Sequence, residues 1–302
     1  MKIKYWIYAS RLYTLPLSFS GITLSFLISK SRVKNSNFTI YILCIITALL
    51  LQILSNFSND YGDSITGVDN SKRIGPKRTI QSGLISLLEM KIAIYLFSIL
   101  SFLSGILLIY KSISYKNFFL FLFYIIGIII CIYSSIKYSI GPYPYGYIVG
   151  MGDLFVFIFF GLCSVIGSYF LYTHTLHMDI FLLSLSIGLL NVSVLNINNM
   201  RDMDNDYENG KYTMAGYLGM KKAKIYHIIS ILISILLGVF FIFLNQKTIY
   251  QWIFFILIVI FLIFHIKRII FLSKKNLFNL EIKRLILIVF LYGLSIGISN
   301  FL

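Results

Sequence analysis

Long apolar stretches recur along the whole chain and are separated by short polar ones. Each stretch is long enough to cross a bilayer as a helix, which requires about 20 apolar residues. Transmembrane strands would instead show segments of about ten residues with alternating polarity. The predicted spans are residues 12–30, 38–57, 92–110, 117–136, 151–172, 179–198, 225–244, 249–271 and 285–301. We therefore predict an all-α, polytopic membrane protein with about nine transmembrane helices.

Composition supports a membrane protein and excludes most soluble classes. Hydrophobic residues make up 58% of the 302 residues and charged residues only 12%, whereas soluble domains carry about 25% charged residues. No linker interrupts the apolar stretches, so we expect one membrane domain over residues 1–302. The net charge of +15 accompanies a bias towards Ile, Lys, Asn, Tyr and Phe. It therefore does not indicate a nucleic-acid partner, and no protein partner is inferred.

The basic residues are divided unevenly between the two sides of the predicted bundle. The N-terminus and the loops after the second, fourth, sixth and eighth spans together hold 20 of the 26 Lys and Arg residues. Cytoplasmic loops are enriched in these residues, so we expect a cytoplasmic N-terminus and a location in the cell's inner, or plasma, membrane. Of the eleven acidic residues, all but Asp179 fall on the same side. The rule for basic residues does not predict this, so the acids are an independent signal.

The first group of acids follows the second span. Asn56 and Asp60 are four residues apart, and Asp60 and Asp63 are three apart, so all three lie on one face if the helix continues. Asp69 comes soon after. The basic residues that follow are Lys72, Arg73, Lys77 and Arg78.

A similar group follows the sixth span. Asp202 and Asp206 are four residues apart, Arg201 precedes them and Lys211 follows. Because both groups end an even-numbered span, both open on the same side and can face each other. Closely packed carboxylates repel unless a cation neutralises them. Mg²⁺ typically binds one or two carboxylates together with substrate phosphates, so the pattern indicates a site for Mg²⁺ and a diphosphate.

These stretches closely resemble the UbiA superfamily of intramembrane prenyltransferases, and above all its members that prenylate 1,4-dihydroxy-2-naphthoate. The resemblance is carried by TLPL from Thr14, LQILSNFSNDYGDSITGVDNSKRIGPKR from Leu51, PYGYIVGMGDLFVFIFFG from Pro144 and VLNINNMRDMDNDYENGKYT from Val194. Together they cover about a quarter of the chain. The second family motif is met by Asp202, Asp206 and Lys211. The first expects a carboxylate where Ser64 stands, so either Asp63 or Asp69 completes it.

The resemblance implies a helical bundle around a central cavity that opens to the cytoplasm, with Mg²⁺ as cofactor. It implies metal ligation by Asn56, Asp60, Asp63, Asp202 and Asp206. Diphosphate contacts are implied for Arg73, Lys77, Arg78, Arg201 and Lys211. Arg11 is a candidate for contact with either the diphosphate or the carboxylate of the acceptor. Tyr143, Tyr145 and Tyr147 are candidates for the acceptor pocket, although interfacial tyrosines also serve as ordinary membrane anchors. Asp153 either orients or deprotonates the acceptor, or is a helix N-terminal acid favoured by the helix dipole.

The implied reaction is Mg²⁺-dependent transfer of a polyprenyl chain from its diphosphate to 1,4-dihydroxy-2-naphthoate, with loss of CO₂, to give demethylmenaquinone. Within the superfamily, 4-hydroxybenzoate, homogentisate, haem and chlorophyllide remain alternative acceptors. A CDP-alcohol phosphotransferase would carry an Asp-Gly-x2-Ala-Arg pattern, which is absent. An ion-coupled transporter would place its acids near the bilayer midplane in broken helices, whereas these acids lie near predicted helix ends.

Overall fold

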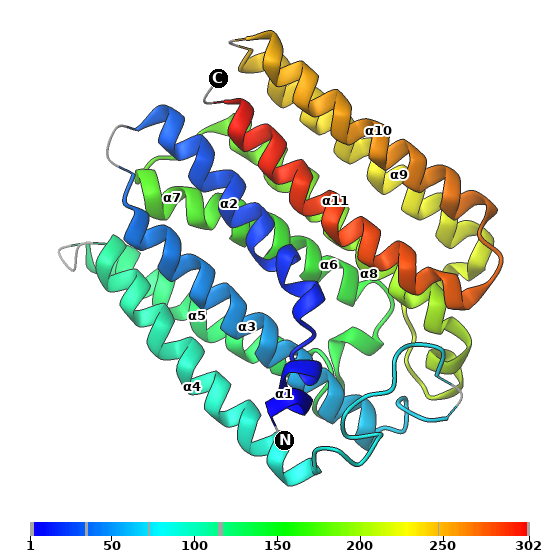
Figure 1. The fold of residues 1–302 in the computed structure, drawn as a ribbon. Coiled ribbons are helices and arrows are strands. Elements are labelled where there is room, and N and C mark those ends of the chain that lie inside the picture. The colour runs from blue at the N-terminus through cyan, green and yellow to red at the C-terminus, as the bar shows by residue number, and fades with distance from the viewer. Residues whose placement is uncertain (1–2, 34–35, 72, 114–116, 247, 301–302) are drawn as a thin grey trace.

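The helices run side by side as a bundle in the computed structural model (Figure 1). The structure describes all residues except 1–2, 34–35, 72, 114–116, 247 and 301–302. Within the described residues, nine helices are long and apolar enough to cross a membrane. This confirms the predicted fold class. The start of the first described helix and the end of the last lie at opposite ends of the bundle, as an odd number of spans requires (Figure 1).

Six of the spans are single helices, and three are composed of shorter segments. The single helices are α3 (Phe38–Ile65), α4 (Leu87–Ser112), α5 (Phe118–Lys137), α8 (Met178–Glu208), α9 (Met214–Leu244) and α10 (Ile249–Phe271). The first span joins α1 (Ile3–Ala9), a 3₁₀ turn η1 (Leu12–Thr14) and α2 (Leu15–Arg32). The fifth joins α6 (Met151–Val156), a π-helical segment η3 (Phe157–Gly167) and α7 (Ser168–Thr173). The ninth span joins a 3₁₀ turn η4 (Lys275–Leu277) to α11 (Phe278–Ser299).

Three helices extend well beyond the apolar stretches that predicted them. Helix α3 continues past residue 57 to Ile65, and α8 continues past residue 198 to Glu208. Helix α9 begins at Met214, before the predicted residue 225, and Gly219 interrupts its regular backbone. The length of an apolar stretch shows only how much of a helix can lie in the hydrocarbon of a membrane. The polar turns that follow can remain helical, so the apolar stretch does not show where the helix ends.

Helix α8 is the central element of the bundle and packs against α9, α11 and η3. Small residues allow a close approach between α8 and η3. A Cβ atom placed on Gly161 would lie 2.8 Å from the Cα of Gly188. Such contacts between small residues are common in membrane bundles, where van der Waals packing replaces the hydrophobic effect. This contact fixes the position of α8, which carries the second group of acids.

A sharp turn between α1 and α2 directs Arg11 towards the end of α3. Arg11 adopts a left-handed backbone conformation with φ 51°, which is uncommon outside glycine and asparagine. The Asn56 side-chain amide donates to the Ser10 carbonyl at 2.9 Å, so α3 holds this turn in place. The sequence predicted a first span from residue 12, and the structure adds α1 before it.

We call the end of the bundle where α3 and α8 finish the carboxylate end. The loop of residues 66–86, which joins α3 to α4, lies across it (Figure 1). The Asn205 side chain of α8 donates to the Val68 carbonyl of this loop at 2.7 Å. Gln81 donates to the carbonyl of Asn70 at 2.7 Å, which folds the loop back on itself. The loop thus covers the ends of both acidic helices.

Candidate functional site

Asp60 lies at the centre of the first group of acids, on the buried face of α3. Its side chain is 1% exposed and is paired with the Arg11 guanidinium. The Nε atom of Arg78, from the α3–α4 loop, lies 3.5 Å from the same carboxylate oxygen. Arg11 also donates to the Asn59 side chain at 2.8 Å. A turn before α2 and a loop after α3 therefore converge on one carboxylate.

Asp63, one turn further along α3, has a different set of partners. The Tyr147 hydroxyl donates to one oxygen at 2.7 Å. The other accepts from the Asn59 amide at 3.2 Å and lies 3.4 Å from the Lys211 ammonium. Tyr147 precedes α6 and Lys211 follows α8. Asp63 therefore joins three parts of the chain that are far apart in sequence.

The second group of acids is arranged around Arg201 on α8. Its guanidinium binds Asp202 through Nε at 2.9 Å and through Nη2 at 2.5 Å. It also donates to Asn198 at 2.8 Å and to Asn279 of α11 at 2.7 Å. Two-point pairing of this kind fixes the orientation of both groups. Asp202 is thus held in place by its own helix and by α11.

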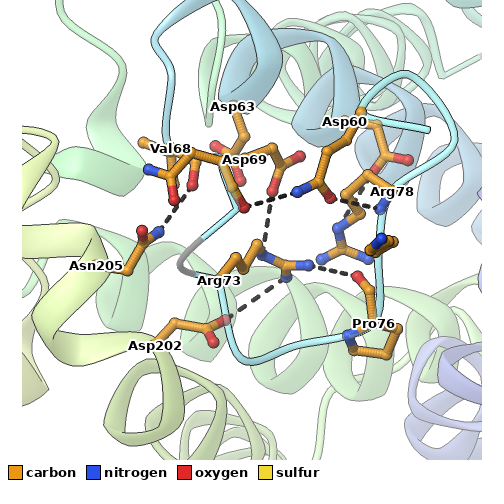
Figure 2. A network of polar contacts seen from close by, with 12 residues as sticks. Asp60, Asp63, Val68, Asp69, Arg73, Pro76, Arg78, Asp202 and Asn205 are labelled. Carbon is orange, nitrogen blue, oxygen red and sulfur yellow. Dashed lines mark hydrogen bonds and ion pairs between the residues drawn. The ribbon is translucent and has the colours of Figure 1, made fainter. Parts of the chain in front are cut away.

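Arg73 bridges the two groups (Figure 2). Its Nε atom lies 3.1 Å from Asp69 of the same loop, and an Nη atom lies 3.6 Å from Asp202 of α8. A further bond to the Pro76 carbonyl at 2.7 Å fixes the guanidinium. Burial and the charge of Asp63 together raise the pKa of Asp69 to about 6. Ion pairs of one loop arginine therefore join the loop that follows α3 to the acidic end of α8.

Lys211 provides the second connection between the groups. Burial alone would lower its pKa, but the carboxylates of Asp206 and Asp63 raise it above the ordinary value. Burial and the nearby charge of Arg11 lower the pKa of Arg78 to about 10. The pairs just described involve five carboxylates and five cations, so the cluster is close to neutral. Such compensation is what buried charges require.

Several predicted site residues lie at the edge of this cluster or outside it. Asp153 is buried in the first turn of α6, where the Tyr226 hydroxyl of α9 lies 3.4 Å from it. Tyr145 donates to the Ser134 carbonyl at 2.8 Å. Lys77 is exposed, and its backbone carbonyl accepts from Tyr8. Tyr143 is 79% exposed and is not part of the cluster.

Sequence reasoning missed three side chains that hold the cluster together. Asn59 joins Arg11 to Asp63, Asn279 fixes Arg201, and Tyr226 contacts Asp153. Asn59 lies in the motif itself, and its helical spacing of four to Asp63 could have identified it. Asn279 and Tyr226 stand apart from any motif. Only the packing of α11 and α9 brings them to the site.

The donor atoms at the carboxylate end fit Mg²⁺ only in part. Within the described residues, no three Asp, Glu, His or Cys side chains form a group that could hold a metal ion. However, the Oδ2 atoms of Asp60 and Asp69 are buried without a hydrogen-bond partner among those residues. Mg²⁺ usually completes its coordination with phosphate and water. The chemistry of these donors therefore fits a metal that arrives with a phosphate ligand.

The fold and this cluster define a polytopic helical membrane protein with a buried, charge-balanced polar site at one end of the bundle. Residues 18–290 match the model of the UbiA prenyltransferase family. The chain therefore belongs to the UbiA prenyltransferase family, as the resemblance of its motifs predicted.

Curated relatives agree with this assignment. The chain is 44% identical over 237 residues to the 1,4-dihydroxy-2-naphthoate octaprenyltransferase of Haemophilus influenzae, covering 78% of this chain and 76% of the relative. It is 39% identical over 249 residues to the protein of that name from Escherichia coli, covering 82% and 80%.

Solved structures of UbiA homologues share the fold. The homologue from Aeropyrum pernix K1 superposes with a TM-score of 0.68 at 16% identity, over 95% of each chain. The homologue from Archaeoglobus fulgidus, solved with DMAPP and Mg²⁺ bound, gives a TM-score of 0.63 at 14% identity, over 95% of this chain and 99% of that one. At these identities the comparison establishes the architecture.

Proposed function

We propose that this chain transfers a polyprenyl group from its diphosphate to 1,4-dihydroxy-2-naphthoate. The observation that carries the proposal is the meeting of two carboxylate groups, bridged by Arg73 and Lys211, at one end of a membrane bundle. Membership of the prenyltransferase family supports the donor. The names of the two bacterial relatives support the acceptor.

When diphosphate binds, the arginines of the cluster would exchange their carboxylate partners for phosphate oxygens. In the structure, Arg11, Arg73 and Arg78 are paired with carboxylates. A guanidinium binds phosphate oxygens in the same two-point manner, so these side chains can turn from carboxylate to diphosphate with little movement. Arg201 and Lys211 supply further positive charge beside Asp202 and Asp63. Exposed Lys77 can join this set only if the loop moves.

We assign the metal ligands to two groups. Asn56, Asp60 and Asp63 would contribute from α3, with Asp69 of the loop as the alternative to Asp63. Asp202 and Asp206 would contribute from α8. Bound Mg²⁺ would neutralise the diphosphate as it leaves. Carboxylates freed from their arginine partners can bind the cation, so each exchange keeps the site close to neutral.

Once the donor is bound in this way, transfer needs a nucleophilic ring next to its allylic carbon. The allylic C–O bond breaks with its electron pair on diphosphate, and the ring carbon that bears the carboxylate forms the new C–C bond. Loss of CO₂ returns its electron pair to the ring. No electrons leave the system, so the immediate product is demethylmenaquinone in its reduced, quinol form.

Asp153 is suited to hold the acceptor. It is buried, and the Tyr226 hydroxyl lies beside it, so a phenol of the acceptor could donate to the carboxylate. Tyr147 is buried against Asp63 and Lys211, where it could border both substrates. Tyr145 packs face to face with Phe155 at 4.2 Å and would shape the pocket from behind. Tyr143 is exposed, and its place in the pocket stays a prediction.

We also propose that the carboxylate end faces the cytoplasm. The 20 basic residues assigned to that side by sequence support this orientation through the enrichment of Lys and Arg in cytoplasmic loops. The water-soluble acceptor and the diphosphate of the donor would then enter from the same compartment.

A substrate panel tests the proposed reaction. We expect purified protein with a polyprenyl diphosphate and Mg²⁺ to prenylate 1,4-dihydroxy-2-naphthoate far faster than 4-hydroxybenzoate or homogentisate. Release of CO₂ and of diphosphate should match product formation one to one. Chelation of divalent metal should stop the reaction, and added Mg²⁺ should restore it.

Each result bears on a different part of the proposal. Faster reaction with 4-hydroxybenzoate would overturn the acceptor while leaving prenyl transfer intact. Full activity after chelation would overturn the metal ligands. Retention of the carboxylate in the product would overturn the site of attack on the ring.

A further inference from the structure

A hollow of about 410 Å³ opens at the carboxylate end between the last turns of α10 and the first turns of α11. It lies outside the polar cluster described above. Its lining residues include three basic side chains, Lys267, Arg268 and Arg284, and one acid, Glu281. Apolar side chains form the rest of the wall. It thus combines positive charge with an apolar surface at the end of two membrane-spanning helices.

Glu281 orders the two arginines without neutralising the hollow. It is buried and accepts from Arg268 at 3.0 Å and from Arg284 at 2.5 Å. It also pairs with His265 of α10 at 2.8 Å. The rim therefore carries three basic side chains, Lys267, Arg268 and Arg284, and one carboxylate, so the hollow keeps a surplus of positive charge. Each guanidinium has further N–H groups, since it carries five donors in all.

The surrounding sequence adds to this surplus. Residues 267–284 contain six Lys and Arg residues and one acid, Glu281. Lys275 is paired with Asp204 of α8, so its charge is neutralised and does not add to the excess of positive charge. Positive charge still predominates in the segment. A concentration of this kind beside a membrane helix attracts anionic lipid headgroups.

Exposed apolar side chains form one wall of the hollow. Phe271, the last residue of α10, is 83% exposed. Leu277, directly before α11, and Leu280, in its first turn, are also exposed and line the same hollow. These residues would be costly to leave against water but can pack against an acyl chain. A free anion would use the basic rim and leave this wall uncovered.

We propose that this hollow binds an acidic phospholipid, with its phosphate between Lys267, Arg268 and Arg284 and an acyl chain against the wall of Phe271, Leu277 and Leu280. The charge of the rim selects the phosphate, and the apolar wall selects a lipid over a free anion. This site is independent of the proposed prenyl transfer, because none of these residues takes part in it.

Thermal unfolding of the full-length protein in detergent tests the site. We expect added phosphatidylglycerol to raise the melting temperature, because a ligand that binds only the folded state stabilises it. Phosphatidylcholine and inorganic phosphate, each at the same concentration, should have little effect. Equal stabilisation by phosphatidylcholine would overturn the charge selection, and equal stabilisation by inorganic phosphate would overturn the lipid.

Matched variants locate the effect. Lys267→Gln alters an exposed side chain and should weaken phosphatidylglycerol binding about fivefold, from the loss of one charge near the membrane surface. Lys267→Gln with Arg284→Gln should weaken it about thirtyfold. Lys222→Gln removes an exposed charge from α9 at the same end and should bind as the unaltered protein does.

Lys267→Gln keeps the test decisive if the double variant does not fold. The proposal is wrong if Lys267→Gln binds phosphatidylglycerol as well as the unaltered protein. It is also wrong if Lys222→Gln weakens binding as much as Lys267→Gln does, since the attraction would then belong to the whole surface.

Discussion

Asp202 and Asp204 stand two positions apart on α8 and lie in opposite surroundings. Asp202 is buried and bound by Arg201 and Arg73. The side chain of Asp204 is 73% exposed and is paired with Lys275. Both side chains have the same charge and size. Comparing a substitution at Asp202 with the same substitution at Asp204 therefore separates the role of the buried site from the effect of losing one acid.

We expect Asp202→Asn to reduce kcat at least about 100-fold, the scale at which loss of one electrostatic stabiliser acts, because Arg201 and a metal ion would both lose their carboxylate. The protein should still insert in the membrane and elute as a single species. Asp204→Asn should keep kcat within about twofold, since an exposed ion pair contributes little. Turnover assays on both purified variants give the comparison, and near-normal activity of Asp202→Asn would remove it from the metal site.

The residues of the site differ in how far their spacing revealed them. Asn56, Asp60 and Asp63 follow one another at spacings of four and three, so helical periodicity alone groups them on one face. Asn279 could not be grouped in this way, because it belongs to α11 and reaches Arg201 only through the packing of α11 on α8. Tyr143 was predicted together with Tyr145 and Tyr147 from the resemblance, and the structure leaves its side chain exposed.

At the scale of elements, apolar length predicted the number of spans but not their ends. The nine apolar stretches correspond to the nine membrane-length helices of the described chain. The polar ends of α3 and α8 stay helical, and this is what places Asp60 and Asp202 on fixed faces. The π-helical segment η3 gave no signal in the sequence. Its position depends on the contact with α8.

The contact between η3 and α8 leaves no room for a side chain. We expect Gly161→Ala to destabilise the protein by about 1–3 kcal/mol, as overpacking usually does, because the new Cβ would meet the Ser184 carbonyl oxygen at 2.7 Å and the Gly188 Cα at 2.8 Å. Gly167→Ala is the matched control, since no atom lies within 4 Å of its Cβ position. Thermal unfolding in detergent should separate the two. Equal melting temperatures would show that η3 can move away from α8.

At the scale of the whole molecule, the site depends on a segment that has no apolar pattern at all. The loop of residues 66–86 places Asp69, Arg73 and Arg78 over the ends of α3 and α8 (Figure 2). Sequence could assign this loop to one side of the membrane from its charge. It could not show that the loop crosses between the two acidic helices, because that path follows from ion pairs between distant residues.

The proposed orientation of the bundle can be tested with single cysteines. Cys44, Cys131 and Cys163 would first be replaced by alanine, and one cysteine would then be introduced at each end. Ser273 is exposed in the loop between α10 and α11 at the carboxylate end, and Leu176 is 59% exposed in the loop between α7 and α8 at the opposite end. Prenyl transfer by both variants would show that they remain folded.

We expect an impermeant maleimide to label Leu176→Cys in intact cells and Ser273→Cys only after the membrane is opened. The physical reason is that basic loops are retained in the cytoplasm, and the orientation of the whole bundle follows once one loop is placed. The parent without cysteines gives the background. Labelling of Ser273→Cys in intact cells would place the carboxylate end outside the cell and would contradict the proposed orientation. The acceptor and the prenyl diphosphate would then have to reach the site from outside the cell.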